Sequence, residues 1–354
     1  MEPLLTYEFD TAQYAKHRFS ATHPLLSFDT VQPVNKKALT KWQLQLRRDV
    51  ARLIGAINSP SRYELTITTL DSVSLDGYQR ETISISVPDS SGLTLFGYLL
   101  IPNEVQRPVP AVICLPGHGR GADSIVGIAE DGNQRPTSSP AEYQMDFALQ
   151  CVSHGYAAFA LEQLGFGHRR DAQARSIGPD CSSCSRDSTA ALMLGETITG
   201  WRVRDAMFAI DYLQTRPEVD VSRIATMGIS GGGLTSFFTA CVDERVKCCV
   251  VSGYFNTFQD SVLSINHCVD NYIPGMLNYA EMPDLAGLCA PRALFVESGA
   301  ADPIFPLPAF QRAVVKAEQI YGAFGASQQF SHEVFDAGHV FHGIGAFDFM
   351  QSKL

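Results

Sequence analysis

RIATMGISGGGL, residues 223–234, is the stretch of this 354-residue chain that decides its fold. The apolar residues before Gly228 predict a buried strand, and the segment after Ser230 predicts a helix. Ser230 lies in a Gly-x-Ser-x-Gly pattern, in which the serine occupies a strained turn and flanking side chains would clash with the strand and the helix. Glycine at 228 and 232 removes those clashes. The pattern therefore predicts a strand, a sharp turn that presents Ser230, and a helix.

Downstream of Pro110, continuous apolar runs alternate with longer segments of helical character. Such runs suit strands that are buried on both faces of a parallel sheet. We predict strands at 111–115, 157–161, 224–227, 248–252, 293–297 and 332–335. We predict helices at 141–154, 200–215, 232–242 and 308–322. The alternation predicts an α/β protein with a doubly wound, mostly parallel central sheet and helices on both faces.

The segment from 62 to 100 predicts strands of another kind. Apolar and polar residues alternate there, and turn residues at 76–77 and 88–89 interrupt the alternation. Alternation with short turns is typical of antiparallel strands. We expect three such strands to open the sheet, at 64–68, 82–87 and 93–100.

Residues 36–57 are predicted to form an amphipathic helix that lies on a larger body. Apolar side chains recur there at spacings of three and four, at Leu39, Trp42, Leu46, Val50 and Leu53. Residues 1–35 have no clear period and predict an irregular arm. We therefore expect an N-terminal extension over 1–60 and a single domain over 61–354. Two long segments, 119–140 and 165–194, are expected as loops that shape a substrate pocket.

A serine hydroxyl is a poor nucleophile at neutral pH and needs a general base, usually a histidine that a carboxylate orients. On a sheet of this kind the expected chain order is serine, acid, histidine. Asp302 follows the predicted strand at 293–297, and His339 follows the last predicted strand. We therefore predict Ser230 as nucleophile, His339 as base and Asp302 as the orienting acid.

Three neighbouring residues compete for these roles. Glu297 competes with Asp302, but it lies within an apolar strand and is expected to point elsewhere. His332 comes at the start of the last strand, at the wrong edge of the sheet. His342 lies three residues beyond His339, in what we expect to be the final helix, and is interpreted as a pocket or surface residue.

Acyl transfer also requires donors that stabilise the developing oxyanion. We expect the backbone N–H of Gly231, which follows the nucleophile, to be one donor. The other is expected from the glycine-rich loop after the first parallel strand, at Arg120 or next to it at Gly119. Further candidates for the pocket wall are His118, Glu162 and Gln163.

Composition excludes several partners. The 27 Lys and Arg against 37 Asp and Glu give a net charge of −10 without any basic run, so nucleic acid and anionic membrane surfaces are disfavoured. No apolar run reaches the roughly 20 residues of a spanning helix. Residues 1–8 lack a basic start followed by an apolar stretch, so we expect a cytoplasmic protein. The sequence does not indicate an oligomeric state.

Nine cysteines are present, most of them in apolar surroundings, and we interpret them as core residues in a reducing compartment. Cys181 and Cys184 alone have the spacing of a redox or zinc pair. No second ligand pair stands out at a suitable distance, so a structural or incidental role is expected and no metal is predicted.

Several segments together resemble the α/β-hydrolase superfamily, and within it the dienelactone-hydrolase-related and acetyl-xylan-esterase-like bacterial carboxylesterases. The segments are PGHG (116–119), LEQLGFGHR (161–169), DYLQTRPEVD (211–220), GISGG (228–232), HCVDNYIPG (267–275) and GAADPIFP (299–306). They span about residues 36–345. The resemblance implies an α/β-hydrolase fold, a serine esterase and no cofactor.

The resemblance also limits the substrate. Dienelactone hydrolase uses a cysteine nucleophile where this chain has Ser230, so ring opening of dienelactones is not expected. Hydrolysis of small, short-acyl carboxylic esters through an acyl-enzyme is the leading hypothesis, with deacetylation of sugars or xylan fragments as an alternative. An amidase or peptidase could use the same residues, although peptidases of this fold usually resemble hydrolases with a large N-terminal propeller. A non-catalytic binding protein with this fold is the remaining alternative.

Overall fold

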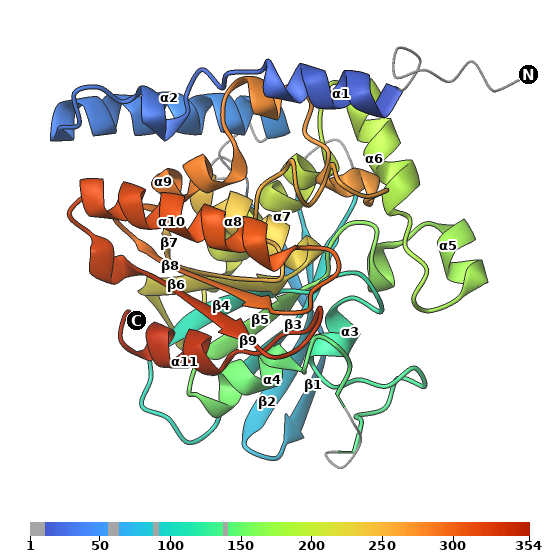
Figure 1. The fold of residues 1–354 in the computed structure, drawn as a ribbon. Coiled ribbons are helices and arrows are strands. Elements are labelled where there is room, and N and C mark those ends of the chain that lie inside the picture. The colour runs from blue at the N-terminus through green and yellow to red at the C-terminus, as the bar shows by residue number, and fades with distance from the viewer. Residues whose placement is uncertain (1–10, 56–63, 88–91, 137–140) are drawn as a thin grey trace, which may run out of the picture.

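The computed structural model describes residues 11–55, 64–87, 92–136 and 141–354, and it is built around one nine-stranded sheet (Figure 1). The order of strands across the sheet is β1-β2-β3-β5-β4-β6-β7-β8-β9. The strands are β1 (Thr66–Leu75), β2 (Tyr78–Ser86), β3 (Leu95–Pro102), β4 (Val109–Leu115), β5 (Ala157–Leu161), β6 (Val219–Ile229), β7 (Val246–Ser252), β8 (Ala293–Gly299) and β9 (Phe330–Phe335).

Pairing directions confirm the predicted fold class. β1, β2 and β3 pair antiparallel, β3 is antiparallel to β5, and all pairs from β5 to β9 are parallel. The β1–β2 hairpin turns at Gly77, whose φ of 81° favours glycine. The first strand is longer than the predicted 64–68 and is exposed over most of its length. The other predicted turn, at 88–89, lies outside the described residues.

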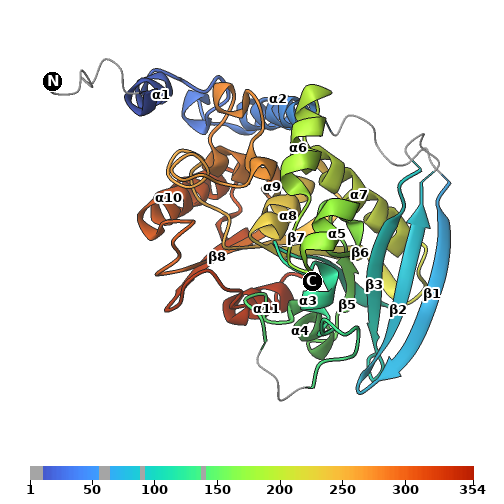
Figure 2. The same ribbon diagram turned by 90° about the vertical axis from the view of Figure 1, so that its right-hand side faces the viewer.

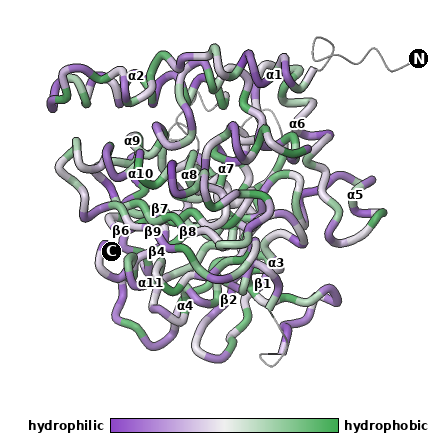
Figure 3. Tube along the Cα trace, in the orientation of Figure 1, coloured by the Kyte–Doolittle hydropathy of each residue, from purple (hydrophilic) through white to green (hydrophobic). Residues whose placement is uncertain are grey.

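Two hydrophobic clusters lie on opposite faces of the sheet. Because side chains alternate along a strand, Ile113 and Leu115 of β4 enter one cluster while Val112 and Cys114 enter the other. The first cluster is covered by α7, α8 and α10, and the second by α3, α4 and α11 (Figures 1 and 2). Hydrophobic segments accordingly concentrate along the central strands (Figure 3).

The four predicted helices correspond to α4, α7, α8 and α10 and agree with them to within a few residues, except that α4 begins six residues late; α3, α5, α6 and α9 were not predicted. Their bounds are α3 (Ala122–Ile125), α4 (Phe147–Ser153), α5 (Ala172–Ile177), α6 (Cys184–Met193), α7 (Ile198–Leu213), α8 (Gly231–Val242), α9 (Ala286–Cys289), α10 (Leu307–Ala323) and α11 (Ile344–Gln351). The two segments expected as loops contain short helices instead, α3 in the first and α5 and α6 in the second. His342 precedes α11 and is not inside it.

The N-terminal segment is helical in two places. α2 (Lys36–Ile54) lies across α7, α8 and α9 (Figure 1). Its buried face contains four of the five predicted residues, but Ile54 is buried where Leu53 was expected and Leu53 is half-buried. The helix ends before Gly55, whose φ of 84° is left-handed. Residues 56–57 of the predicted helix lie outside the described part of the chain. α1 (Thr11–Ser20) replaces part of the expected irregular arm and buries none of its residues.

Among the described residues, no helix combines the length and the apolar character that crossing a membrane would require.

Candidate active site

Ser230 occupies a strained turn between β6 and α8. Its φ of 56° and ψ of −123° lie outside the regions that ordinary residues prefer. A Cβ on Gly232 would come within 1.9 Å of the Leu115 carbonyl oxygen, and one on Gly228 within 2.3 Å of the Gly232 oxygen. The backbone N–H of Ser230 donates to the Ser252 carbonyl at 3.0 Å. The close approach of strand and helix is therefore possible only because both positions are glycine.

His339 and Asp302 form a directly bonded pair. Nδ1 of His339 donates to Oδ2 of Asp302 at 2.7 Å, and the Asp302 side chain is only 1% exposed. The other carboxylate oxygen, Oδ1, accepts the backbone N–H groups of Ile304 at 2.8 Å and Phe305 at 3.1 Å. Asp302 follows β8 and His339 follows β9, so both come from the same edge of the parallel sheet.

The ring of His339 is held between two aromatic rings. Tyr143 lies 5.9 Å away with an interplanar angle of 22°, and Phe305 lies 5.8 Å away at 23°. Nε2 of His339 is buried and has no hydrogen-bond partner among the described residues. The ring therefore has one nitrogen fixed by Asp302 and the other available to a hydroxyl or a ligand.

Ser230 and His339 line one pocket of about 360 Å³. Its walls come from the loop after β4, the segment after β7 and the loops that carry Asp302 and His339. The lining residues are His118, Tyr143, Ser230, Ile265, Asn266, His267, Cys268, Ile304 and His339. The pocket is small and mixed in character, with imidazoles beside aliphatic side chains.

Glu297 and His342, the competing candidates for acid and base, make contacts within or to the loop that follows β9. The carboxylate of Glu297 accepts the backbone N–H groups of His342 at 2.9 Å and Gly343 at 3.0 Å, and burial raises its pKa. His342 lies against Glu333 at 3.2 Å. His332 is an exposed residue within β9. None of these three candidates lines the pocket that contains Ser230.

The loop after β4 approaches Ser230 at Gly117 and His118. A Cβ on Gly117 would lie 3.3 Å from that of Ser230, and one on Gly231 would lie 3.3 Å from Nδ1 of His118. The backbone N–H of Gly117 already donates to Gln144 at 2.7 Å. The hydroxyl of Tyr143 donates to the His118 carbonyl at 2.6 Å. These contacts place His118, and no later residue of the loop, at the pocket.

Arg120 and Gly119, the expected donors of the second oxyanion contact, do not line the pocket. The guanidinium of Arg120 is 7% exposed and points away, toward Glu142 and the Ile128 carbonyl, to which Nη1 donates at 2.8 Å. Beyond this point the loop leads into α3, which begins directly after Gly121. The assignment of a backbone N–H of Arg120 or Gly119 as the second donor stays a prediction.

Glu162 and Gln163 do not line the pocket; they form hydrogen bonds to the loop after β4. The carboxylate of Glu162 accepts backbone N–H groups of Ala122 at 3.2 Å and His168 at 3.1 Å, and burial raises its pKa to about 7. The amide of Gln163 donates to the Pro116 carbonyl and accepts from the Thr235 hydroxyl of α8. Both side chains therefore fix the loop relative to the nucleophile turn.

Sequence reasoning missed Tyr143 and Gln144, which hold His339 and the loop. Both fall within the helix predicted over 141–154, but in the structure they lie just before α4, and a tyrosine or glutamine there carries no spacing signal. Of the wall at 265–268, His267 and Cys268 belong to the segment 267–275 that carries the family resemblance, while Ile265 and Asn266 carry no signal in the sequence. The placement of this wall depends on contacts between segments far apart in the chain.

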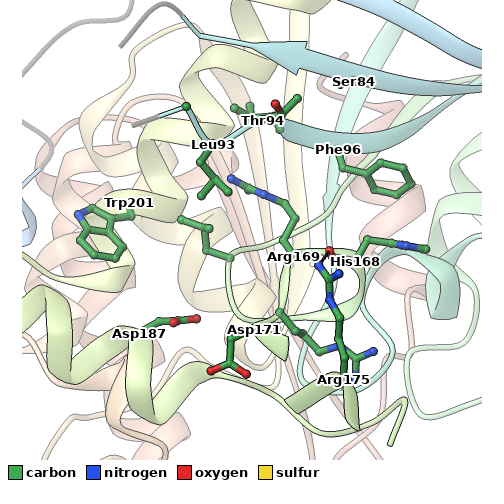
Figure 4. Close-up of a pocket in the computed structure, with 14 residues that line it drawn as sticks. Ser84, Leu93, Thr94, Phe96, His168, Arg169, Asp171, Arg175, Asp187 and Trp201 are labelled. Carbon is green, nitrogen blue, oxygen red and sulfur yellow. Dashed lines mark hydrogen bonds between the residues drawn. The ribbon is translucent and has the colours of Figure 1, made fainter. Parts of the chain in front are cut away.

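A cavity of about 610 Å³ lies elsewhere, between β3 and the segment around α5 (Figure 4). Its cationic groups are already engaged. Arg169 binds Asp205 at 2.6 Å, Arg170 donates to the carbonyls of Gly167 and Gly178 at 2.6 Å each, and Arg175 donates to a backbone carbonyl. Among the described residues that line this cavity, none is a nucleophile paired with a base.

Comparison with known proteins gives matches over most of the chain. The model of the Abhydrolase family matches residues 11–319. A Bacillus subtilis (strain 168) protein, named as a candidate hydrolase, YtaP, is 26% identical over 290 residues, which are 79% of this chain and 88% of that protein.

Two solved structures share the fold. One is a Bacteroides fragilis NCTC 9343 protein described as a candidate acetyl xylan esterase, with a TM-score of 0.76, 19% identity and coverage of 97% of this chain and 89% of that one. The other is a glucuronoyl esterase from Solibacter usitatus, with a TM-score of 0.68, 16% identity and coverage of 94% and 99%. At these identities the similarity establishes the fold.

Proposed function

This chain belongs to the Abhydrolase family, and from that premise we propose that it is a serine hydrolase that cleaves small, short-acyl carboxylic esters. The observation that carries the proposal is the arrangement at one pocket. There, His339 is hydrogen-bonded to Asp302 at 2.7 Å, and its buried Nε2 has no hydrogen-bond partner in the described part of the chain, while Ser230 lines the same pocket from a strained turn. This is the set of groups that acyl transfer through a covalent intermediate requires.

In the proposed reaction, Nε2 of His339 takes the proton of the Ser230 hydroxyl as the oxygen attacks the ester carbonyl. The imidazolium that forms is stabilised by Asp302, and it returns the proton to the leaving alkoxide when the C–O bond breaks. A water molecule then attacks the acyl-enzyme by the same route, with His339 as base. The products are a carboxylic acid and an alcohol.

The oxyanion is expected to accept hydrogen bonds from the backbone N–H groups of Gly231 and His118. Gly117 is unsuitable because its N–H is already donated to Gln144. His118 is the next residue of the loop, and its ring lies beside Gly231 at the pocket. A preorganised donor of this kind contributes a factor of about 10²–10³ to kcat.

The nucleophile is tested with a fluorophosphonate probe and Ser230→Ala. We expect the wild-type protein to be labelled once, and Ser230→Ala to lose both the label and ester hydrolysis, because no other serine lies beside His339 in the pocket. Ser153→Ala, which removes an exposed hydroxyl of α4, serves as the control and is expected to label normally. A wild-type protein that never labels would refute the hydrolase proposal, and labelling that persists in Ser230→Ala would refute the choice of serine.

The substrate class is tested with p-nitrophenyl esters of increasing chain length, acetylated sugars and an anilide. A pocket of about 360 Å³ bounded by Ile265, Ile304 and aromatic rings favours short acyl groups. We expect kcat/KM to fall as the acyl chain lengthens and the anilide to react slowest. Deacetylation of sugars is the second candidate, suggested by the fold shared with the Bacteroides protein. Preference for long chains or for the anilide would contradict the short-ester proposal.

A further inference from the structure

At the wall of the pocket that His118 and Cys268 line, four side chains with metal-binding atoms converge from three parts of the chain. His118 comes from the loop after β4, Cys184 is the first residue of α6, and Cys268 and Asp270 lie at η5 (Val269–Asn271). One ligand atom from each lies within 4.8 Å of all the others. We refer to these four residues as the thiol cluster. Ester hydrolysis as proposed above uses neither cysteine.

Two distances within the thiol cluster match those between ligands of a tetrahedral zinc ion, and the remaining ligand atoms lie within 4.8 Å of one another. Nε2 of His118 lies 3.3 Å from Oδ2 of Asp270, and Sγ of Cys184 lies 3.5 Å from the same oxygen. With zinc–ligand bonds of about 2.0–2.3 Å, neighbouring ligands are about 3.3–3.8 Å apart. Although Nε2 of His118 is buried and close to a carboxylate, it has no hydrogen-bond partner of normal geometry among the described residues.

Arg202 donates hydrogen bonds to two members of the thiol cluster. Its fully buried guanidinium donates to Oδ2 of Asp270 at 2.8 Å and to Sγ of Cys184 at 2.9 Å, and it lies over the Phe166 ring. Asn271 donates to the other Asp270 oxygen at 2.6 Å. Contacts of this kind, made to the ligands themselves, orient metal ligands in known sites.

Charge balance also fits a divalent ion. With a metal bound, two thiolates, one carboxylate and a neutral imidazole would carry three negative charges, of which Arg202 compensates one, and buried charges require compensation. A divalent cation supplies the remaining two charges.

We propose that the thiol cluster is a structural zinc site that ties the loop after β4 to α6 and to the 268–270 segment. Two sulfurs and an imidazole favour zinc over magnesium or calcium, and four protein ligands leave no open position for catalysis. Binding releases to solvent the protons that the two thiols and the imidazole hold before the metal binds. Cys181, the partner of Cys184 by sequence spacing, is not a member, since its Sγ faces the Ser182 carbonyl at 3.8 Å.

The proposal is tested by the zinc content of the purified, full-length chain, measured by plasma mass spectrometry after gel filtration in metal-free buffer. We expect about one zinc per wild-type chain and loss of most of it in Cys184→Ser and Cys268→Ser. Cys181→Ser is the matched control and should retain the full zinc content. Ser230→Ala should also retain it, which separates this result from the test of hydrolysis.

Because the serine variants could misfold, a second measurement uses wild-type protein alone. The chain is reduced, stripped with a chelator and titrated with Co²⁺, for which we expect the absorption bands of a tetrahedral thiolate site, displaced by one equivalent of Zn²⁺. Wild-type protein that contains no zinc and shows no such bands would overturn the proposal. A thiol count lowered by two, marking a Cys184–Cys268 disulfide in place of a metal, would overturn it as well.

Discussion

The two carboxylate oxygens of Asp302 have different partners. Oδ2 accepts Nδ1–H of His339, while Oδ1 accepts the backbone N–H groups of Ile304 and Phe305 that shape the loop. The same side chain therefore fixes both the loop and the imidazole. If an asparagine replaces Asp302, its amide oxygen can still accept the N–H groups of the loop, but its NH₂ group now donates to the imidazole ring, where the carboxylate accepted.

Asp302→Asn is expected to lower kcat for ester hydrolysis by about 10³–10⁴-fold. The amide oxygen replaces Oδ1 and the NH₂ group faces His339, so Nδ1 must accept and the ring proton moves to Nε2. His339 can then no longer take a proton from Ser230. The measurement is kcat with p-nitrophenyl acetate, together with a urea unfolding midpoint, which should stay near that of wild type. A loss of less than about tenfold, or 1.4 kcal/mol, would argue against this role.

His342→Ala is the matched control for the histidine. His342 lies three residues beyond His339 but pairs with Glu333 and does not line the pocket. We expect kcat close to that of wild type. A loss as large as that of Asp302→Asn would mean that the base had been assigned to the wrong histidine.

At single positions, sequence reasoning was effective where chain order and strand ends constrain the geometry. Ser230, Asp302 and His339 each follow a predicted strand, and parallel strands bring their carboxyl ends to one edge of the sheet. Arg120 and Gly119 were not so constrained. The earlier part of their loop is held by Tyr143 and Gln144, more than 20 residues later.

At the scale of elements, the loop after β4 is fixed by a buried carboxylate. Glu162 sits between Gly121 and Gly167, where a Cβ on either glycine would lie 2.0 Å from one of its oxygens. It accepts backbone N–H groups of Ala122 and His168. Burial raises the pKa of Glu162 to about 7, which couples this junction to pH.

Glu162 is expected to make the protein less stable as pH rises from about 4.5 to about 7. In that range the unfolded chain has already lost the proton that the folded chain retains, so the free energy of unfolding falls, by at most about 3 kcal/mol. Glu162→Gln removes this contribution because its amide does not titrate. Urea unfolding of both proteins across the range should show their difference growing in favour of the variant. Parallel curves would contradict the assignment.

Strands were predictable from the sequence where they are buried on both faces, and helices where one stripe of the helix is buried. β5 begins and ends as predicted, and α8 begins one residue early. α1 and α6 were missed for the opposite reason. α1 buries no residue, and α6 buries only Cys184, Ser188 and Ala191, so neither presents the apolar period that identifies a helix from sequence.

For the molecule as a whole, α2 continues the core instead of forming a separate unit. Its buried residues belong to the same hydrophobic cluster as those of α7, α8 and α10. Trp42 is 6% exposed, its Nε1–H donates to the Leu26 carbonyl at 2.8 Å, and its ring meets Phe28 at 5.6 Å. A Cβ on Gly287 of α9 would lie 2.3 Å from the indole, so the two segments are in direct contact.

Trp42→Ala is therefore expected to destabilise the entire chain, by about 3–5 kcal/mol, because it removes a large buried side chain and leaves a cavity between α2 and α9. Urea unfolding is followed in parallel by far-ultraviolet circular dichroism and by ester hydrolysis. Both midpoints should fall together, since the cluster that contains Trp42 extends to the helices that cover the sheet. Lys41→Ala, one position away and exposed, should change neither midpoint appreciably. A hydrolysis midpoint that stays in place while the dichroism changes would instead mean that the N-terminal segment unfolds on its own, and that the sheet and its pocket are stable without it.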